Sequence, residues 1–319
     1  MILLNPFILT FLAVESLLFF FAFIAFYYSF KIVLGYRANR LSTKDYLLSK
    51  QGYLVSTIIV FILIIKLPLF LFFVWSMDEI SFLVPGAMCG VGIVDATNFG
   101  AYMLFLKIIN LFLLSGWLFI NYKDFQSPTS NFFITKFKFF IPLFIFFIFE
   151  FVFEWIHFSS IRVDEVVECC SQIFKSTALT KVPFWHKNLF ILSIFYFSFL
   201  LLLFWALTKI EVMFGFFSFI FMFFTIYAII RYFSPYIYEL PLHKCPFCML
   251  QKEYHYIGYL IYLLIFFGTL PGLFVFLEKI LEVDVDLKLY KISMIINTIL
   301  VLLLSYFPLS YYIKNGVWL

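Results

Sequence analysis

Two cysteines, Cys245 and Cys248, lie three positions apart in the segment HKCPFCMLQK at residues 243–252. Thiols at this spacing can close a small disulfide ring, and a helix that began here would lower a thiolate pKa through its free N–H groups and dipole. A long apolar run follows from about Tyr256, so we expect the pair to open a membrane helix. The pattern predicts thiol–disulfide exchange, with a metal site and a static disulfide as the alternatives.

The same segment carries a set of soft metal ligands. His243, Cys245, Cys248 and Met249 lie within seven residues, and imidazole, thiolate and thioether groups together suit Cu(I). Met249 stands where the covalent c-type haem motif requires a histidine, which disfavours that attachment. Copper or haem handling is therefore the second hypothesis. The third hypothesis is a non-catalytic subunit of a respiratory or transport complex, in which the cysteines only form structural disulfides between loops.

The remaining cysteines, Cys89, Cys169 and Cys170, also fall outside the apolar runs. Two adjacent cysteines are too constrained to bridge each other easily, because bridged alpha carbons usually lie about 5.5 Å apart. We expect either Cys169 or Cys170 to form a disulfide with Cys89 or to exchange with the Cys245 and Cys248 pair. The other of the two adjacent cysteines then keeps a mobile thiol. All five cysteines are then candidates for the catalytic site.

The elements that must position these residues are membrane helices. Of the 319 residues, 65% are hydrophobic and 13% are charged, and the mean hydropathy is +1.06, which predicts an all-α, polytopic bundle in a lipid bilayer. We expect one integral membrane domain over residues 1–319 without a soluble domain, with a possible parallel repeat of four plus four helices over about 1–160 and 188–319. Eight uncharged or nearly uncharged runs are long enough to span the membrane: about 7–30, 53–76, 100–121, 139–158, 189–207, 212–232, 256–277 and 292–313. Glu15, in the first of these runs, is assigned no role.

The distribution of basic residues predicts an orientation. Twelve lysines and arginines follow the first, third, fifth and seventh runs, and eight lie on the opposite side. Because basic residues are retained in the cytoplasm, the first set is expected there, and all five cysteines then face the outside. This favours a multi-pass protein of a bacterial inner membrane with its cysteine-bearing loops in the periplasm, where thiols are oxidised. The dispersed basic residues do not indicate a nucleic-acid partner.

The run at 139–158 carries a polar face. Glu150, Glu154 and His157 are spaced by four and three residues, which places them on one side of a helix. Ionisable groups at membrane depth are expensive and usually line an interior path or site. We expect them to pass protons to or from a cofactor or to bind a metal. The alternative is a buried cluster that pairs with Lys66 or Lys107.

The segment CPFCMLQK resembles the Cys-x-x-Cys-x-x-Gln/Glu-Arg/Lys segment of the bacterial quinone-coupled disulfide oxidases of the DsbB type. The order of loop cysteines before the Cys-x-x-Cys is more similar to that of the vitamin K epoxide reductase family. The resemblance covers residues 243–252 and implies a quinone cofactor and a soluble extracytoplasmic thiol protein as partner. It also implies that Lys252, four positions after Cys248, helps to hold the quinone. If a quinone is bound, we expect Glu154 and His157 to handle its protons.

Overall fold

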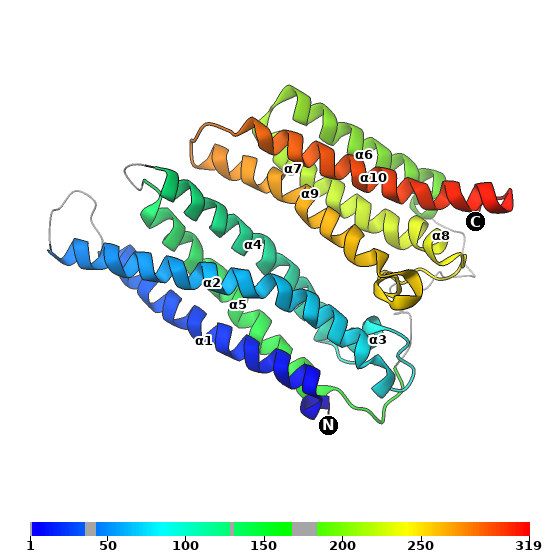
Figure 1. Ribbon diagram of the computed structural model, residues 1–319, viewed down its shortest axis with the longest axis horizontal. Coiled ribbons are helices and arrows are strands. Elements are labelled where there is room, and N and C mark those ends of the chain that lie inside the picture. Colours follow the sequence, from blue (N-terminus) through cyan, green and yellow to red (C-terminus); the bar gives the residue numbers. More distant parts are fainter. Residues whose placement is uncertain (1, 36–42, 128–130, 168–183) are drawn as a thin grey trace. The chain divides into compact units, whose positions relative to one another are not determined.

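The computed structural model describes residues 2–35, 43–127, 131–167 and 184–319, which form helices and turns without a strand (Figure 1). Eight helices in these segments are long and apolar enough to cross a membrane, and each overlaps one of the runs predicted from the sequence. The prediction of an all-α, multi-pass membrane protein is therefore confirmed. The spans are α1 (Pro6–Gly35), α2 (Thr43–Glu79), α4 (Gly100–Gln126), α5 (Phe133–Ser160), α6 (Asn188–Thr208), α7 (Glu211–Ala228), α9 (Ile257–Ile280) and α10 (Leu287–Asn315).

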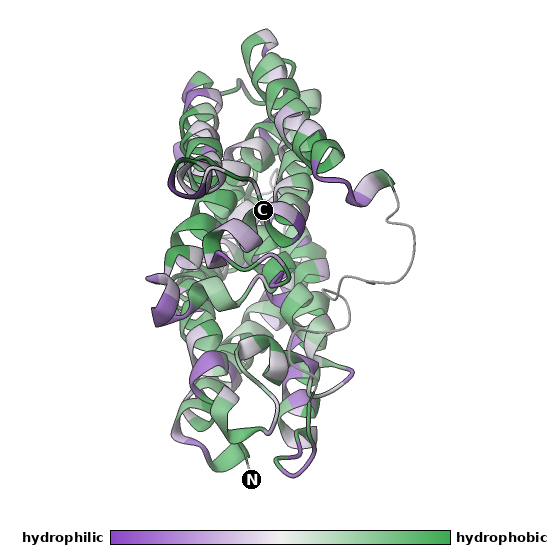
Figure 2. Ribbon diagram, turned by 90° about the vertical axis from the view of Figure 1, so that its right-hand side faces the viewer, coloured by the Kyte–Doolittle hydropathy of each residue, from purple (hydrophilic) through white to green (hydrophobic). Residues whose placement is uncertain are grey.

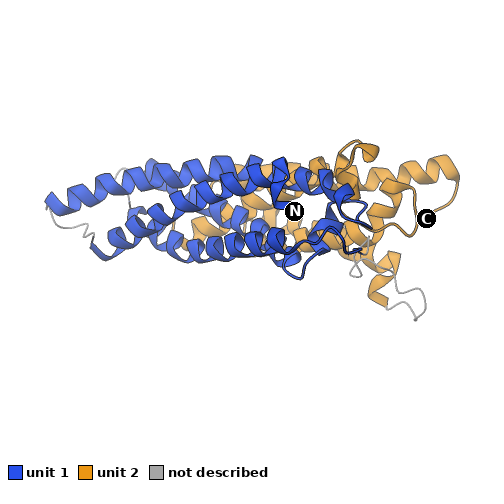
Figure 3. Ribbon diagram, turned by 90° about the horizontal axis from the view of Figure 1, so that it is seen from below, with its two compact units in different colours: residues 1–167 blue, residues 168–319 orange. Residues whose placement is uncertain are grey.

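The chain divides into two compact units, Met1–Val167 and Glu168–Leu319, and each holds four of the spans (Figure 3). In unit 1, α1 packs against α2 and α5, and α4 packs against α5 and α2, with the short α3 (Gly90–Asp95) at one end. In unit 2, α6, α7, α9 and α10 pack in the same cyclic order. Each unit is therefore a four-helix bundle with neighbouring helices adjacent in the chain. The predicted parallel repeat stays a prediction.

Unit 1 reverses the usual distribution of side chains. Its helices carry large apolar residues on their outer faces, as expected where lipid replaces water, and Figure 2 shows that apolar residues cover most of each long helix. On α5 the buried stripe includes Phe137, Phe140, Phe144 and Phe147 and continues with charged groups. Because the stripe repeats every three or four residues, it points all of these side chains into the bundle.

Unit 2 is held by close helix contacts at small residues. A Cβ on Gly272 of α9 would lie 2.2 Å from the Ser218 hydroxyl of α7, so only glycine allows this approach. On the other side of α9, the hydroxyl of Ser293 and the amide of Asn297 in α10 both donate to the Gly268 carbonyl, at 2.8 Å and 3.1 Å. These contacts fix α9, whose first turn follows the Cys-x-x-Cys segment.

Candidate thiol site and buried charge cluster

The Cys-x-x-Cys segment lies in the connection before α9. The sixth span passes from α7 through a π-helical turn (Ile229–Phe233) into α8 (Ser234–Tyr238), and Glu239 then ends the helix in a left-handed conformation with φ of 55°. Cys248 begins a 3₁₀ turn, η5 (Cys248–Leu250), which is followed by η6 (Lys252–Tyr254).

The prediction that the pair opens a long helix is wrong. The helix α9 begins only at Ile257, because His255 and Tyr256 both adopt left-handed conformations, with φ of 53° and 56°, that interrupt a helical path. The dipole of a long helix therefore does not act on either thiol. The pair instead depends on the loop around it for its geometry.

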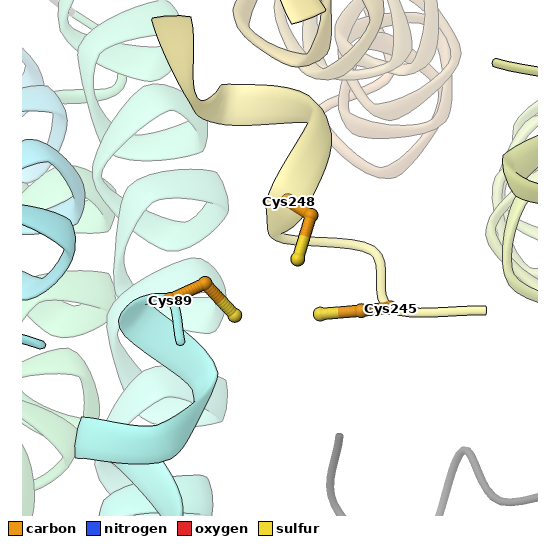
Figure 4. Close-up of side chains that lie close together, drawn as sticks. All are labelled: Cys89, Cys245 and Cys248. Atoms are coloured by element: carbon orange, nitrogen blue, oxygen red, sulfur yellow. The ribbon is translucent and has the colours of Figure 1, made fainter. Parts of the chain in front are cut away.

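The two thiols of this loop lie close together. The sulfur atoms of Cys245 and Cys248 are within 4.8 Å of one another, and both side chains are buried. Figure 4 shows Cys248 at the start of the η5 turn and Cys245 in the loop segment that leads into it. A disulfide requires about 2.05 Å between sulfurs, so a modest rotation of the side chains would allow the bond to form.

Two tyrosines hold the backbone of the loop, of which Tyr238 is buried and Tyr262 is half-buried. The Tyr238 hydroxyl accepts a hydrogen bond from the Met249 N–H at 2.9 Å and donates one to the Cys245 carbonyl, so it bridges the two ends of the Cys-x-x-Cys turn. The Tyr262 hydroxyl, on α9, donates to the Pro246 carbonyl at 2.7 Å. Because both hydroxyls bond to backbone groups, the positions of the cysteines are fixed independently of their side-chain chemistry.

The start of α9 packs directly against this loop. A Cβ on Gly258 would lie 2.5 Å from the Met249 Cγ and 2.9 Å from the Leu250 Cδ2, closer than real Cβ contacts allow. Met249 and Leu250 are both buried in this contact region. Gly258 is thus a residue of the site that sequence reasoning missed. A glycine in the first turn of a helix could have indicated that another segment packs closely there, but nothing else in the sequence pointed to it.

Partial burial of the loop shifts the pKa values of ionisable side chains in and around it. Burial, and secondly the charge of Arg231, lower the pKa of Lys244, which directly precedes Cys245. Burial, and secondly the neighbouring Cys248, raise the pKa of Tyr254. The predicted quinone ligand Lys252 is exposed on η6. Two basic residues therefore flank the pair in the chain, Lys244 half-buried and Lys252 exposed.

The metal hypothesis receives partial support from the geometry. Cys245 and Cys248 are close enough to share an ion, and Met249 is buried beside them in the chain. His243 packs its ring edge-on against Tyr238, with ring centroids 4.6 Å apart. No group of three ligand atoms within 4.8 Å in the described part of the chain includes His243. The copper ligand set of His243, Cys245, Cys248 and Met249 stays a prediction.

Cys89 belongs to unit 1, where it directly precedes α3 with an extended backbone. The glycines around it are explained by packing against protein: a Cβ on Gly86, whose φ is +86°, would lie 2.2 Å from the Val167 carbonyl oxygen, and one on Gly92 would lie 2.5 Å from the Ala87 Cβ. Cys169 and Cys170 lie outside the described residues. The catalytic roles predicted for these three cysteines stay predictions.

A second cluster of functional groups lies inside unit 1. Glu150 and Glu154 share the buried face of α5, as predicted, and the lysines of two neighbouring helices reach them. Lys66 of α2 contacts Glu150 at 2.6 Å, and Lys107 of α4 contacts Glu150 at 3.1 Å and also Glu154. The alternative prediction, a buried cluster that includes these lysines, is confirmed.

Glu15 is the member of this cluster that sequence reasoning missed. Its carboxylate lies 2.9 Å from Lys66 Nζ and 3.2 Å from Lys107 Nζ, and only 5% of its side chain is exposed. The signal was an isolated acidic residue in a membrane span, which by itself predicts a buried partner. That partner could not be named because Lys66 and Lys107 lie 51 and 92 positions further along the chain.

His157 occupies the next turn of α5 beyond Glu154 and is fully buried. Its Nδ1 lies 2.6 Å from the Thr97 hydroxyl, and Gly100, where a Cβ would lie 2.8 Å from the imidazole Cε1, permits the ring to fit. The face predicted from the spacing of Glu150, Glu154 and His157 therefore exists, and it runs from the charged cluster toward the loop before α4.

The fold and the site define a class of protein: a multi-pass α-helical membrane protein with a Cys-x-x-Cys loop and a buried cluster of charges. None of the family models, curated proteins or solved structures compared with the chain matches it. Its function is therefore argued from its own residues.

Proposed function

We propose that the chain is a membrane thiol–disulfide oxidoreductase whose redox-active pair is Cys245 and Cys248. The geometry of that pair carries the proposal: two sulfur atoms lie within 4.8 Å of one another, in a loop fixed by two tyrosine hydroxyls. Lys244 and Lys252, which flank the pair in the chain, are proposed to stabilise the thiolate that exchange requires.

The proposed reaction transfers two electrons and two protons. A thiolate of a soluble extracytoplasmic dithiol protein attacks the disulfide of the pair, which forms a mixed disulfide and releases one thiolate of the pair. The partner's second thiol resolves this intermediate, so the partner is oxidised and the pair becomes a dithiol. The dithiol then passes two electrons and two protons to a membrane quinone, which becomes a quinol. The same steps in reverse would reduce the partner.

Lys252 is proposed to contact the quinone. It is exposed on η6, four positions after Cys248, and an ammonium there would offset negative charge that develops on a quinone oxygen. The role of Glu154 and His157 in exchanging the protons of the quinone stays a prediction. The membrane proposed is a bacterial inner membrane with the cysteine-bearing connections in the periplasm, because more lysines and arginines follow the odd-numbered spans than the even-numbered ones.

Trapping of the mixed disulfide tests the proposal. In cells that express Cys248→Ser, Cys245 should hold a partner in a mixed disulfide that appears on a non-reducing gel and disappears with reductant. The matched control is the double variant Cys245→Ser, Cys248→Ser, which should show no adduct. Absence of any adduct, together with stoichiometric copper or haem that is lost in Cys245→Ser, would replace the proposal with metal handling. Unchanged function of the double variant within a larger complex would instead indicate a non-catalytic subunit.

A further inference from the structure

The buried cluster of unit 1 holds an unbalanced set of charges. Glu15, Glu150 and Glu154 supply three carboxylates, and Lys66 and Lys107 supply two ammonium groups; no side chain among them is more than 5% exposed. If all five are ionised, one negative charge remains in the middle of an apolar bundle. A net charge at this depth is costly, so the cluster requires one additional positive charge, which a proton or a small cation can supply.

The hydrogen bonds of the cluster identify where that charge belongs. Both oxygens of Glu15 contact a lysine, and Glu150 is contacted through Oε1 by the two lysines and through Oε2 by the Asn110 amide. Glu154 contacts Lys107 through Oε1 alone. Its Oε2 is fully buried and has no hydrogen-bond partner among the described residues. Of the three carboxylates, only Glu154 therefore has an oxygen available for a proton.

The two lysines are held as cations, which leaves the proton to a carboxylate. Lys107 Nζ lies 4.6 Å from the ring centroid of Phe11 and 4.9 Å from that of Phe73, and Lys66 Nζ lies 4.7 Å from that of Phe147. An aromatic face favours the charged form of an amine over the neutral form. Each lysine also contacts at least two carboxylates.

His157 provides a route from this position to one end of the bundle. It follows Glu154 by three residues on the same face of α5, and its Nδ1 bonds to Thr97 in the loop before α4. Its Nε2 is buried and has no hydrogen-bond partner among the described residues. Imidazole can accept a proton on one nitrogen and release one from the other, which is the property that a proton relay requires.

We propose that Glu154 binds one exchangeable proton on Oε2 and that His157 transfers this proton between Glu154 and the Thr97 end of unit 1. The groups that face the site are Glu15 of α1, Lys66 of α2, Lys107 and Asn110 of α4, and Glu150 of α5. Unit 1 is then a proton-binding module, and its proton binding can be measured whether or not the thiol chemistry proposed for unit 2 is correct.

Infrared spectroscopy of the purified, full-length protein tests the assignment. At neutral pH the wild type should show the carbonyl stretch of a protonated carboxylic acid that shifts in D₂O, and Glu154→Gln should remove one such band. The matched control is Glu278→Gln, which changes another buried glutamate, in unit 2, and should leave that band in place. Retention of every band in a folded Glu154→Gln variant would overturn the proposal.

The charge balance makes a second, sharper test with variants of the neighbouring groups. Glu150→Gln removes one negative charge, so Glu154 should ionise and its band should disappear although Glu154 is still present. Lys66→Met removes one positive charge, so an additional protonated carboxyl should appear. Opposite or absent changes in folded variants would contradict the charge-balance argument. Loss of the band when sodium replaces a large organic cation would assign the site to a metal cation instead of a proton.

The relay role of His157 has a kinetic readout. His157→Gln should leave the intensity of the Glu154 band unchanged but should slow its exchange into D₂O by about a hundredfold, the contribution typical of a positioned proton-transfer group. A residue that served only to pack the helices would change the stability of the fold without this selective loss. Exchange at the wild-type rate would remove His157 from the route.

Discussion

Replacement of Tyr238 by phenylalanine should release the Cys-x-x-Cys loop without changing its sulfur chemistry. The substitution keeps the ring that packs against His243 and Tyr254 but removes the hydroxyl that accepts from the Met249 N–H and donates to the Cys245 carbonyl. For each neutral backbone group that loses its partner we take about 1–2 kcal/mol, the lower part of the range typical of buried polar groups. For the two groups together we expect the free energy of local opening to fall by about 2–4 kcal/mol.

Hydrogen–deuterium exchange at the Met249 amide measures this opening. A fall of about 2–4 kcal/mol corresponds to exchange that is about 30-fold to about 700-fold faster. Alkylation of Cys245 in the reduced protein should accelerate in the same variant, because the thiol becomes accessible more often. Tyr256→Phe is the matched control, since Tyr256 lies in the same connection but is 47% exposed. Exchange at the wild-type rate in Tyr238→Phe would refute the reasoning that the hydroxyl fixes the loop.

Three further predictions concern packing, ion pairing and pH. Gly258→Val introduces a Cβ that would lie only 2.5 Å from Met249 Cγ, so the variant should lose about 1–3 kcal/mol of stability in denaturant unfolding. Leu260→Ala, at an exposed site in the same helix, is the control and should change stability by less than about 0.5 kcal/mol. Lys136→Met breaks a buried 2.8 Å ion pair with Asp124 and should cost about 3–5 kcal/mol, part of which Asp124→Leu should restore in the double variant. Because burial lowers the pKa of Lys244, the unfolded chain binds more protons than the folded chain between that lowered pKa and the ordinary lysine value; stability should rise with pH across this window, and Lys244→Gln should flatten the rise.

Each of these predictions has an outcome that would count against it. A Gly258→Val variant as stable as the wild type would show that the start of α9 can move away from the loop. Additive effects in the Lys136 and Asp124 double variant would mean that the two groups do not interact. Equal slopes of thermal stability against pH in Lys244→Gln and the wild type would show that Lys244 is not desolvated by folding.

The membrane spans could be predicted from the sequence because the bilayer imposes a length and an apolar composition on every span. The same constraint made Glu150, Glu154 and His157 visible, since charged residues in an apolar run stand out and their spacing fixes their common face. Lys66 and Lys107 were recognisable as partners for the same reason. In this part of the chain, therefore, local sequence contained most of the information about the site.

The contacts that complete each site depend on residues far apart in the chain, which local patterns do not encode. Glu15 joins the cluster only because α1 packs between α2 and α5. Tyr238 and Tyr262 are ordinary residues of a Tyr-rich chain, and nothing in their spacing indicates hydrogen bonds to the loop between them. The expectation that the cysteine pair opens α9 fails because hydropathy does not report the left-handed residues His255 and Tyr256, which separate the pair from the helix.

The redox state of the Cys245 and Cys248 pair tests the central claim most directly. The purified protein would be equilibrated in thiol–disulfide buffers of graded potential, alkylated, and analysed by mass spectrometry of the peptide that contains both residues. The account predicts a reversible two-electron transition between a Cys245–Cys248 disulfide and a dithiol while the protein remains folded. Persistence of two separately alkylated thiols under every oxidising condition would contradict it.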